Sequence, residues 1–152
     1  PSRTNVDLSV ETLGRLASIK NIVAVKEATD SASKILALSK IVSKDFSMLA
    51  GDCASTAFMM SCGGTGVISA TANIIAKELS ELTSTALNGD IKSAVLQQVE
   101  LHSKITALFS ETNPAPVKEA LYMIGKIKSP ELRLPLTRVS ENCKKKLQEL
   151  FL

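Results

Sequence analysis

The positions of the short apolar segments that predict strands constrain the fold most, because all of them fall in the first half of the chain. The predicted strands are residues 22–26 (IVAVK), 46–50 (FSMLA) and 67–70 (VISA). The predicted helices before and between them are residues 9–20, 31–42 and 54–62. Because helices alternate with strands, this half favours an α/β fold with a parallel sheet and crossover helices.

From about residue 74 onward the sequence predicts only helices and one extended stretch. The predicted helices are residues 74–88, 90–109, 114–125 and 140–151, and the extended stretch is residues 132–137. Three strands are too few for an independent parallel sheet, since such a sheet needs cover on both faces and partners for its edges. The chain begins at Pro1 rather than Met. We therefore expect the chain to be the end of a larger fold, with a segment before Pro1.

Composition excludes several classes of function. A net charge of +3 and an aromatic content of 3% give no basis for nucleic-acid binding. With His102 as the sole histidine, a multi-histidine metal site cannot form, and His102 is better explained as a surface or packing residue. Cys53, Cys62 and Cys143 lack metal-binding or disulfide spacing. Together with the lack of an apolar run of about 20 residues, this predicts a cytoplasmic protein without a metal or a membrane segment.

Lys26 is the residue that points to chemistry. Strand alternation places it on one face with Ile22 and Ala24, opposite Val25 and Glu27. A lysine at the end of a buried strand, above an apolar floor, has its ammonium form disfavoured, and a neutral amine can attack a carbonyl to form a Schiff base. Most lysines at strand ends are simply solvated, so the spacing alone does not decide between these interpretations.

Six motifs carry a family resemblance. They are PSRT at 1–4, VKEAT at 25–29, LAGD at 49–52, GGTGVISATAN at 63–73, NPAPVKEAL at 113–121 and LRLPLT at 132–137. In this order, over essentially the whole chain, they resemble the dihydrodipicolinate synthase (4-hydroxy-tetrahydrodipicolinate synthase) family of pyruvate-dependent class I aldolases. The VKEAT and GGTGVIS motifs also resemble the wider superfamily that includes N-acetylneuraminate lyase. The NPAPVK and LRLPLT motifs favour the synthase.

The resemblance implies the C-terminal part of a TIM (β/α)8 barrel followed by a helical extension. Residues 1–73 would be the barrel half, and residues 74–152 the last barrel helix and the extension. A complete barrel takes about 250 residues. We therefore expect the N-terminal half of the same protein, with the family's proton-relay tyrosine and threonine residues, to be missing from this chain. The chain alone is then expected to be inactive, and the whole protein to be a homodimer or homotetramer.

The resemblance also assigns the site. It implies that Lys26 forms a covalent imine with pyruvate without any other cofactor, and that L-aspartate 4-semialdehyde is the second substrate, as in the diaminopimelate route to lysine. Arg3 would bind the carboxylate of that substrate, and Gly51 and Ile68 would line the pocket. Without the resemblance, Arg3 is explained as a surface residue, Gly51 as part of a turn and Ile68 as a core strand residue.

Two alternatives remain open. The first is another pyruvate-dependent class I aldolase, such as one with the specificity of N-acetylneuraminate lyase. The second comes from a different class of function: a non-catalytic helical fragment that serves in assembly. Pyruvate trapping on Lys26 separates an enzyme from an assembly fragment, and the choice of aldehyde separates the two enzymes.

Overall fold

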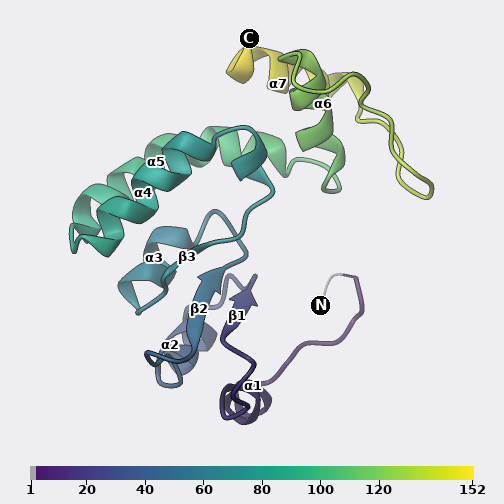
Figure 1. The fold of residues 1–152 in the computed structure, drawn as a ribbon. Helices are drawn as coiled ribbons and strands as arrows, with labels where there is room; N and C mark the ends of the chain where they lie inside the picture. Colours follow the sequence, from purple (N-terminus) through teal and green to yellow (C-terminus); the bar gives the residue numbers. More distant parts are fainter. Residues whose placement is uncertain (1–2) are drawn as a thin grey trace. The chain divides into compact units, whose positions relative to one another are not determined.

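The computed structural model describes residues 3–152 and divides the chain into two compact units (Figure 1). The first unit ends at Ile68 and the second covers Ser69–Leu152. The elements of the first unit are α1 (Val10–Ala17), β1 (Ala24–Glu27), α2 (Ala32–Ser39), β2 (Ser47–Ala50), α3 (Thr56–Ser61) and β3 (Gly66–Val67). Those of the second are the 3-10 turn η1 (Thr71–Asn73), α4 (Ala76–Leu87), α5 (Ile91–Leu108), α6 (Ala115–Met123) and α7 (Glu141–Phe151). The division into residues 1–73 and 74–152 stays a prediction.

The three strands form a parallel sheet in the order β1-β2-β3. Lys26 is level with Leu49 on β2, and Leu49 is level with Gly66 on β3. Helices α1, α2 and α3 pack on one face of the sheet, around a core of Leu13, Ile35, Leu38, Met48, Ala50 and Met59. The α/β class with a parallel sheet and crossover helices, predicted from the alternating pattern, is therefore confirmed.

Polar caps explain where the helices begin. The side chains of Ser9, Ser31, Asp90 and Ser140 each accept a hydrogen bond from the backbone N–H three residues later. A cap of this kind stabilises a helix by about 1 kcal/mol relative to alanine. Gly89 and Gly125 follow α4 and α6 with φ angles of 90° and 70°, which suit a glycine after a helix end.

The third strand is shorter than its apolar sequence predicts. It covers Gly66–Val67, so the prediction of a strand over residues 67–70 was wrong in its extent. The side chain of Ser69 accepts a hydrogen bond from the backbone N–H of Thr71 at 3.0 Å and so turns the chain into η1. A local side-chain contact of this kind competes with the strand.

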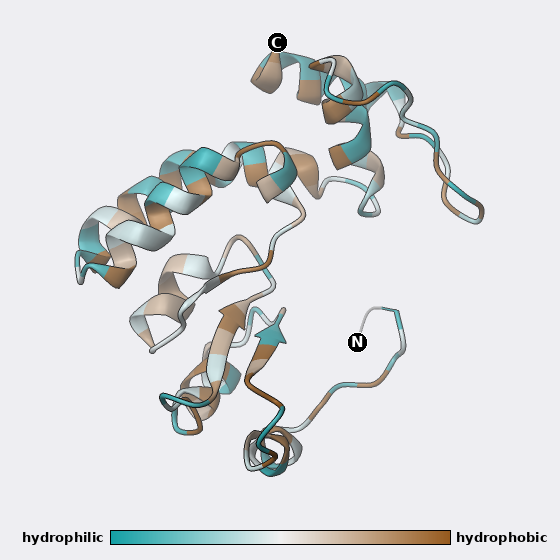
Figure 2. Cartoon of the chain, viewed as in Figure 1, coloured by the Kyte–Doolittle hydropathy of each residue, from teal (hydrophilic) through white to brown (hydrophobic). Residues whose placement is uncertain are grey.

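The second unit is helical, as predicted. Helices α4 and α5 pack together, and α6 and α7 enclose an apolar core with the end of α5, visible as the hydrophobic sides of these helices in Figure 2. Between α6 and α7 the chain has no regular structure. There Arg138 forms two hydrogen bonds, of 2.8 and 3.0 Å, to the buried carboxylate of Glu119. Within residues 3–152, no helix is long and apolar enough to span a membrane.

Candidate functional site

Lys26 lies near the carboxyl end of β1, on the face of the sheet that the helices do not cover. Its neighbours Val25 and Glu27 face the other way: Val25 packs against the core and Glu27 is buried. Lys26 itself is exposed. Figure 2 shows the hydrophilic tip of an otherwise hydrophobic strand at this point. The alternation predicted from the sequence is therefore confirmed, and the amine extends from the open face of the sheet.

Gly51 lies directly beneath the side chain of Lys26. A Cβ atom built on Gly51 would be 3.0 Å from Cε and 3.1 Å from Cγ of Lys26, and 2.9 Å from Cβ of Ala28. The backbone N–H of Gly51 donates to the carbonyl oxygen of Glu27 at 2.7 Å, which continues the sheet pairing beyond β2. Only a glycine leaves enough space for the lysine to cross at this position.

Ile68 lies at the same end of the sheet. Its N–H donates to the carbonyl oxygen of Ala50 at 2.8 Å, and Ala50 is level with Val67, so Ile68 is level with Gly51. Its side chain is 49% exposed in this chain. Lys26, Gly51 and Ile68 therefore meet at the carboxyl ends of β1, β2 and β3.

Arg3 is exposed in a turn near the start of the described chain, while Pro1 and Ser2 of the PSRT motif lie outside the described residues. The segment after it borders a hollow of about 470 Å³. Its walls are Thr4, Val6, Asp7, Leu8, Leu13, the end of β1 from Val25 to Glu27, and Ala28 just after it. The segment that carries Arg3 thus lies along the end of the strand that carries Lys26. The role assigned to the Arg3 side chain stays a prediction.

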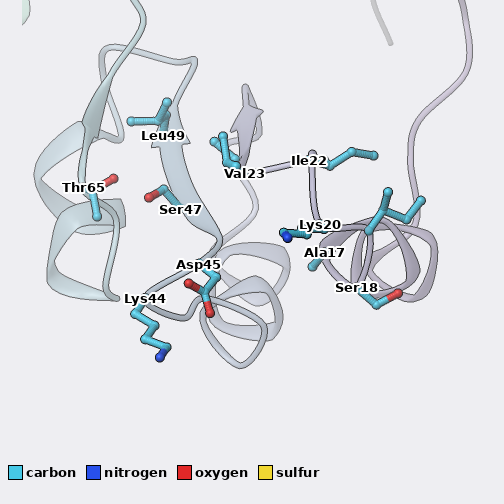
Figure 3. A pocket seen from close by; sticks show the side chains of 12 residues that line it. Ala17, Ser18, Lys20, Ile22, Val23, Lys44, Asp45, Ser47, Leu49 and Thr65 are labelled. Atoms are coloured by element: carbon cyan, nitrogen blue, oxygen red, sulfur yellow. The ribbon is translucent and has the colours of Figure 1, made fainter.

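A larger hollow, of about 810 Å³, opens at the amino-terminal ends of the strands (Figure 3). Lys20, Lys44 and Asp45 border it from the loops before β1 and β2, and Ser47 and Leu49 border it from β2. In a complete barrel the side chains of the other strands fill the interior below the active site. We therefore place the candidate site at the opposite, carboxyl end of the sheet, with Lys26.

Sequence reasoning missed a charged cluster next to Lys26. The Nζ atom of Lys34, on α2, lies 2.8 and 2.9 Å from the two carboxylate oxygens of Asp7 and 2.7 Å from Oε2 of Glu27. One signal in the sequence could have revealed this cluster. Lys34 lies one turn before Leu38, so it falls on the core-facing side of the predicted helix, where a charged residue needs a partner. We refer to Asp7, Glu27 and Lys34 as the Lys34 cluster.

The cluster alters the protonation of its members. Desolvation alone would lower the pKa of Lys34, but hydrogen bonds from its ammonium to Asp7 and Glu27, and their negative charges, raise that pKa above its ordinary value. The hydrogen bond from Lys34 lowers the pKa of Asp7. Both directions favour the charged forms of Lys34 and Asp7.

The chain matches the model of the dihydrodipicolinate synthetase family over residues 1–151. The crystal structure of dihydrodipicolinate synthase from Aquifex aeolicus is 44% identical with a TM-score of 0.93, over 99% of this chain and 51% of that one. The enzyme from Acinetobacter baumannii, complexed with pyruvate, is 38% identical with a TM-score of 0.92, over 98% and 51%. The enzyme from Thermotoga maritima is 35% identical with a TM-score of 0.93, over 98% and 52%. The chain spans about half the length of each, as expected for the C-terminal part of a barrel.

Proposed function

Because the chain belongs to the dihydrodipicolinate synthetase family, we propose that it supplies the Schiff-base lysine, Lys26, of a 4-hydroxy-tetrahydrodipicolinate synthase. The whole protein would condense pyruvate with L-aspartate 4-semialdehyde in cytoplasmic lysine biosynthesis. The observation that carries the proposal is the position of Lys26. Its side chain crosses Gly51 on the open face at the carboxyl end of the sheet, where barrel enzymes of this class have their active sites.

The proposed reaction uses the amine of Lys26 as a nucleophile. The amine attacks the ketone carbon of pyruvate, and loss of water gives an imine. The imine withdraws electrons, so a proton leaves the methyl group and an enamine forms. The enamine carbon then bonds to the aldehyde carbon of the semialdehyde, whose oxygen takes up a proton to become a hydroxyl group. Finally, the amino group of the added substrate attacks the imine carbon, which closes the ring and releases Lys26 as a free amine.

The other predicted residues have supporting roles. Arg3 would bind the carboxylate of the semialdehyde, for which a planar guanidinium is well suited. Gly51 leaves space for the lysine, and the backbone at Ile68 borders the imine. The proton-relay groups would come from the N-terminal half of the same protein. We propose that this half closes the barrel and that the complete protein forms a homodimer or a homotetramer.

Borohydride trapping tests the proposal. The protein with its complete barrel is incubated with pyruvate and borohydride, digested and mapped by mass spectrometry. We expect a reduced pyruvate adduct on Lys26, because borohydride reduces an imine to a stable amine. Absence of an adduct, or an adduct confined to another lysine, contradicts the proposal. Turnover with aspartate 4-semialdehyde but not with N-acetylmannosamine then distinguishes the synthase from a sialic-acid-lyase specificity.

Replacing Gly51 by alanine should displace the reactive amine. The added Cβ would lie 2.9 Å from Cβ of Ala28 and 3.0 Å from Cε of Lys26, so the lysine must move aside. We expect kcat/KM to fall about a hundredfold, because a shift of about 1 Å at a reacting group has an effect of this size. The matched control is Gly66→Ala, whose Cβ would lie 3.5 Å from Cδ2 of Leu49, an ordinary contact. Equal activity of the two variants would show that Gly51 has no special role.

A further inference from the structure

Lys34 joins three parts of the first unit. It lies on α2, and its Nζ atom contacts Asp7 in the segment before α1 and Glu27 at the end of β1. Glu27 directly follows Lys26, and Asp7 lies four residues after Arg3. Lys34 therefore links the strand that carries the nucleophile to the segment that carries the predicted carboxylate-binding arginine.

In the Lys34 cluster, the contact between Lys34 and Glu27 is the inner one and is shielded from solvent, whereas Asp7 lies on the outside. The side chains of Lys34 and Glu27 are only 14% and 9% exposed, whereas that of Asp7 is 53% exposed. A buried carboxylate such as Glu27 requires a partner of opposite charge. The inner contact with Glu27 thus fixes the ammonium group, and the outer contact with Asp7 attaches the segment to it.

Within residues 3–152, the ion pair between Lys34 and Asp7 ties the segment to α2. Residues 4–8 make no backbone hydrogen bond to a strand or helix within residues 3–152. The side chains of Val6 and Leu8 are 67% and 48% exposed. The hollow of about 470 Å³ lies between this segment and the end of β1, with Asp7 and Lys26 both in its wall. The contacts of Lys34 with Asp7 and Glu27 therefore set the distance between residues 4–8 and β1.

We propose that Lys34 is a positioning residue, which holds the Arg3-bearing segment at a fixed distance from Lys26 through its paired contacts with Asp7 and Glu27. This inference rests on the proposed function. When the contact with Asp7 is lost, the segment loses its ion pair with α2 and binds the second substrate less tightly. Imine formation between Lys26 and pyruvate, which does not use the segment, is unaffected.

The first test is Asp7→Asn in the protein with its complete barrel. This change removes the negative charge and one of the two acceptor oxygens of the outer contact, and it leaves the pair of Lys34 with Glu27 intact. We expect KM for aspartate 4-semialdehyde to rise about fivefold, while kcat and KM for pyruvate stay within about twofold. A rise in one KM alone separates positioning from a general structural role, which would also lower kcat or the stability.

Lys34→Met and Lys34→Arg form the second test. The methionine variant should show the same rise in KM together with a lower Tm, because Glu27 is left buried without a partner. Arginine, which can reach two carboxylates with its five donors, should restore KM to within about twofold of the unsubstituted protein. The matched control is Lys77→Met, which removes an exposed ion pair with Glu81 on α4 and should change neither KM nor kcat.

The outcomes separate this inference from the proposed function. If borohydride traps no pyruvate on Lys26 of the unsubstituted protein, both fail together. If the adduct forms but Asp7→Asn has an unchanged KM for the semialdehyde, the positioning role alone is overturned. The positioning role is also overturned if Asp7→Asn lowers kcat and raises KM for both substrates equally. Failure of Lys34→Arg to restore KM for aspartate 4-semialdehyde overturns it as well. Because Asp7→Asn does not disturb a buried charge, this variant gives an answer even where Lys34→Met does not fold.

Discussion

Replacing Lys26 by methionine in the complete protein should abolish the trapped pyruvate adduct and lower kcat/KM for condensation at least about ten-thousandfold. Methionine has a similar length but no amine, so no imine can form. The fold should be retained, because methionine has a similar length and Lys26 packs into neither apolar core of this chain. Unchanged far-ultraviolet circular dichroism and an unchanged Tm would verify this.

The variant Lys26→Arg tests whether activity needs the nucleophilic amine of Lys26 or only its positive charge. Arginine keeps a positive charge at the same position but is never deprotonated in a protein, so it cannot attack pyruvate. We expect it to be as inactive as the methionine variant. The control is Lys44→Met, at an exposed lysine before β2, which should retain full activity. Substantial turnover by either Lys26 variant would refute the Schiff-base role.

The 152-residue chain by itself should condense its substrates at a rate at least about a thousandfold below that of the complete protein. Its sheet has open edges at β1 and β3 among the described residues, so nothing there closes the site. Its sole tyrosine, Tyr122, lies on α6, 45% exposed, rather than on the sheet. Pyruvate consumption in the presence of aspartate 4-semialdehyde measures the rate. We also expect the chain to associate, since open strand edges and apolar faces favour association.

Supplying an N-terminal half in trans tests the same prediction from the opposite side. The N-terminal half of the Aquifex aeolicus synthase, from a relative 44% identical to this chain, can be coexpressed with it. We expect turnover to appear with the two halves together and to depend on Lys26. A chain that turns over alone at the rate of the complete protein contradicts the prediction. A monodisperse, well-folded monomer in sedimentation contradicts the expected association.

Most of the fold was predictable because local signals mark its elements. Ser9 and Asp90 cap helices as their sequence context indicates, and Gly89 ends one at a positive φ angle. The exception is the strand predicted over residues 67–70, a mostly apolar segment in which the hydroxyl of Ser69 bonds locally and turns the chain. Hydrophobic pattern alone cannot distinguish a strand from an apolar segment whose backbone is diverted by a side chain.

The site was predictable only in part. Alternation placed Lys26 on the correct face, and the family motifs pointed to Gly51 and Ile68. The contact of Gly51 with Lys26 depends on the register between β1 and β2, and no sequence pattern contains that register. The Lys34 cluster was missed because its three members come from different segments, and only the packing of α2 on β1 brings Lys34 to Glu27.

The strand order β1-β2-β3, identical to the order along the chain, also bears on how such a protein can be divided. Each strand with its helix is added beside the previous one, so no segment is threaded through another. In a barrel built in this way, the polypeptide can be interrupted between any two consecutive strand–helix units, and the two pieces can still pack side by side. We expect circular permutants with new termini in the loops between these units to fold, and designed split versions to reassemble by lateral docking.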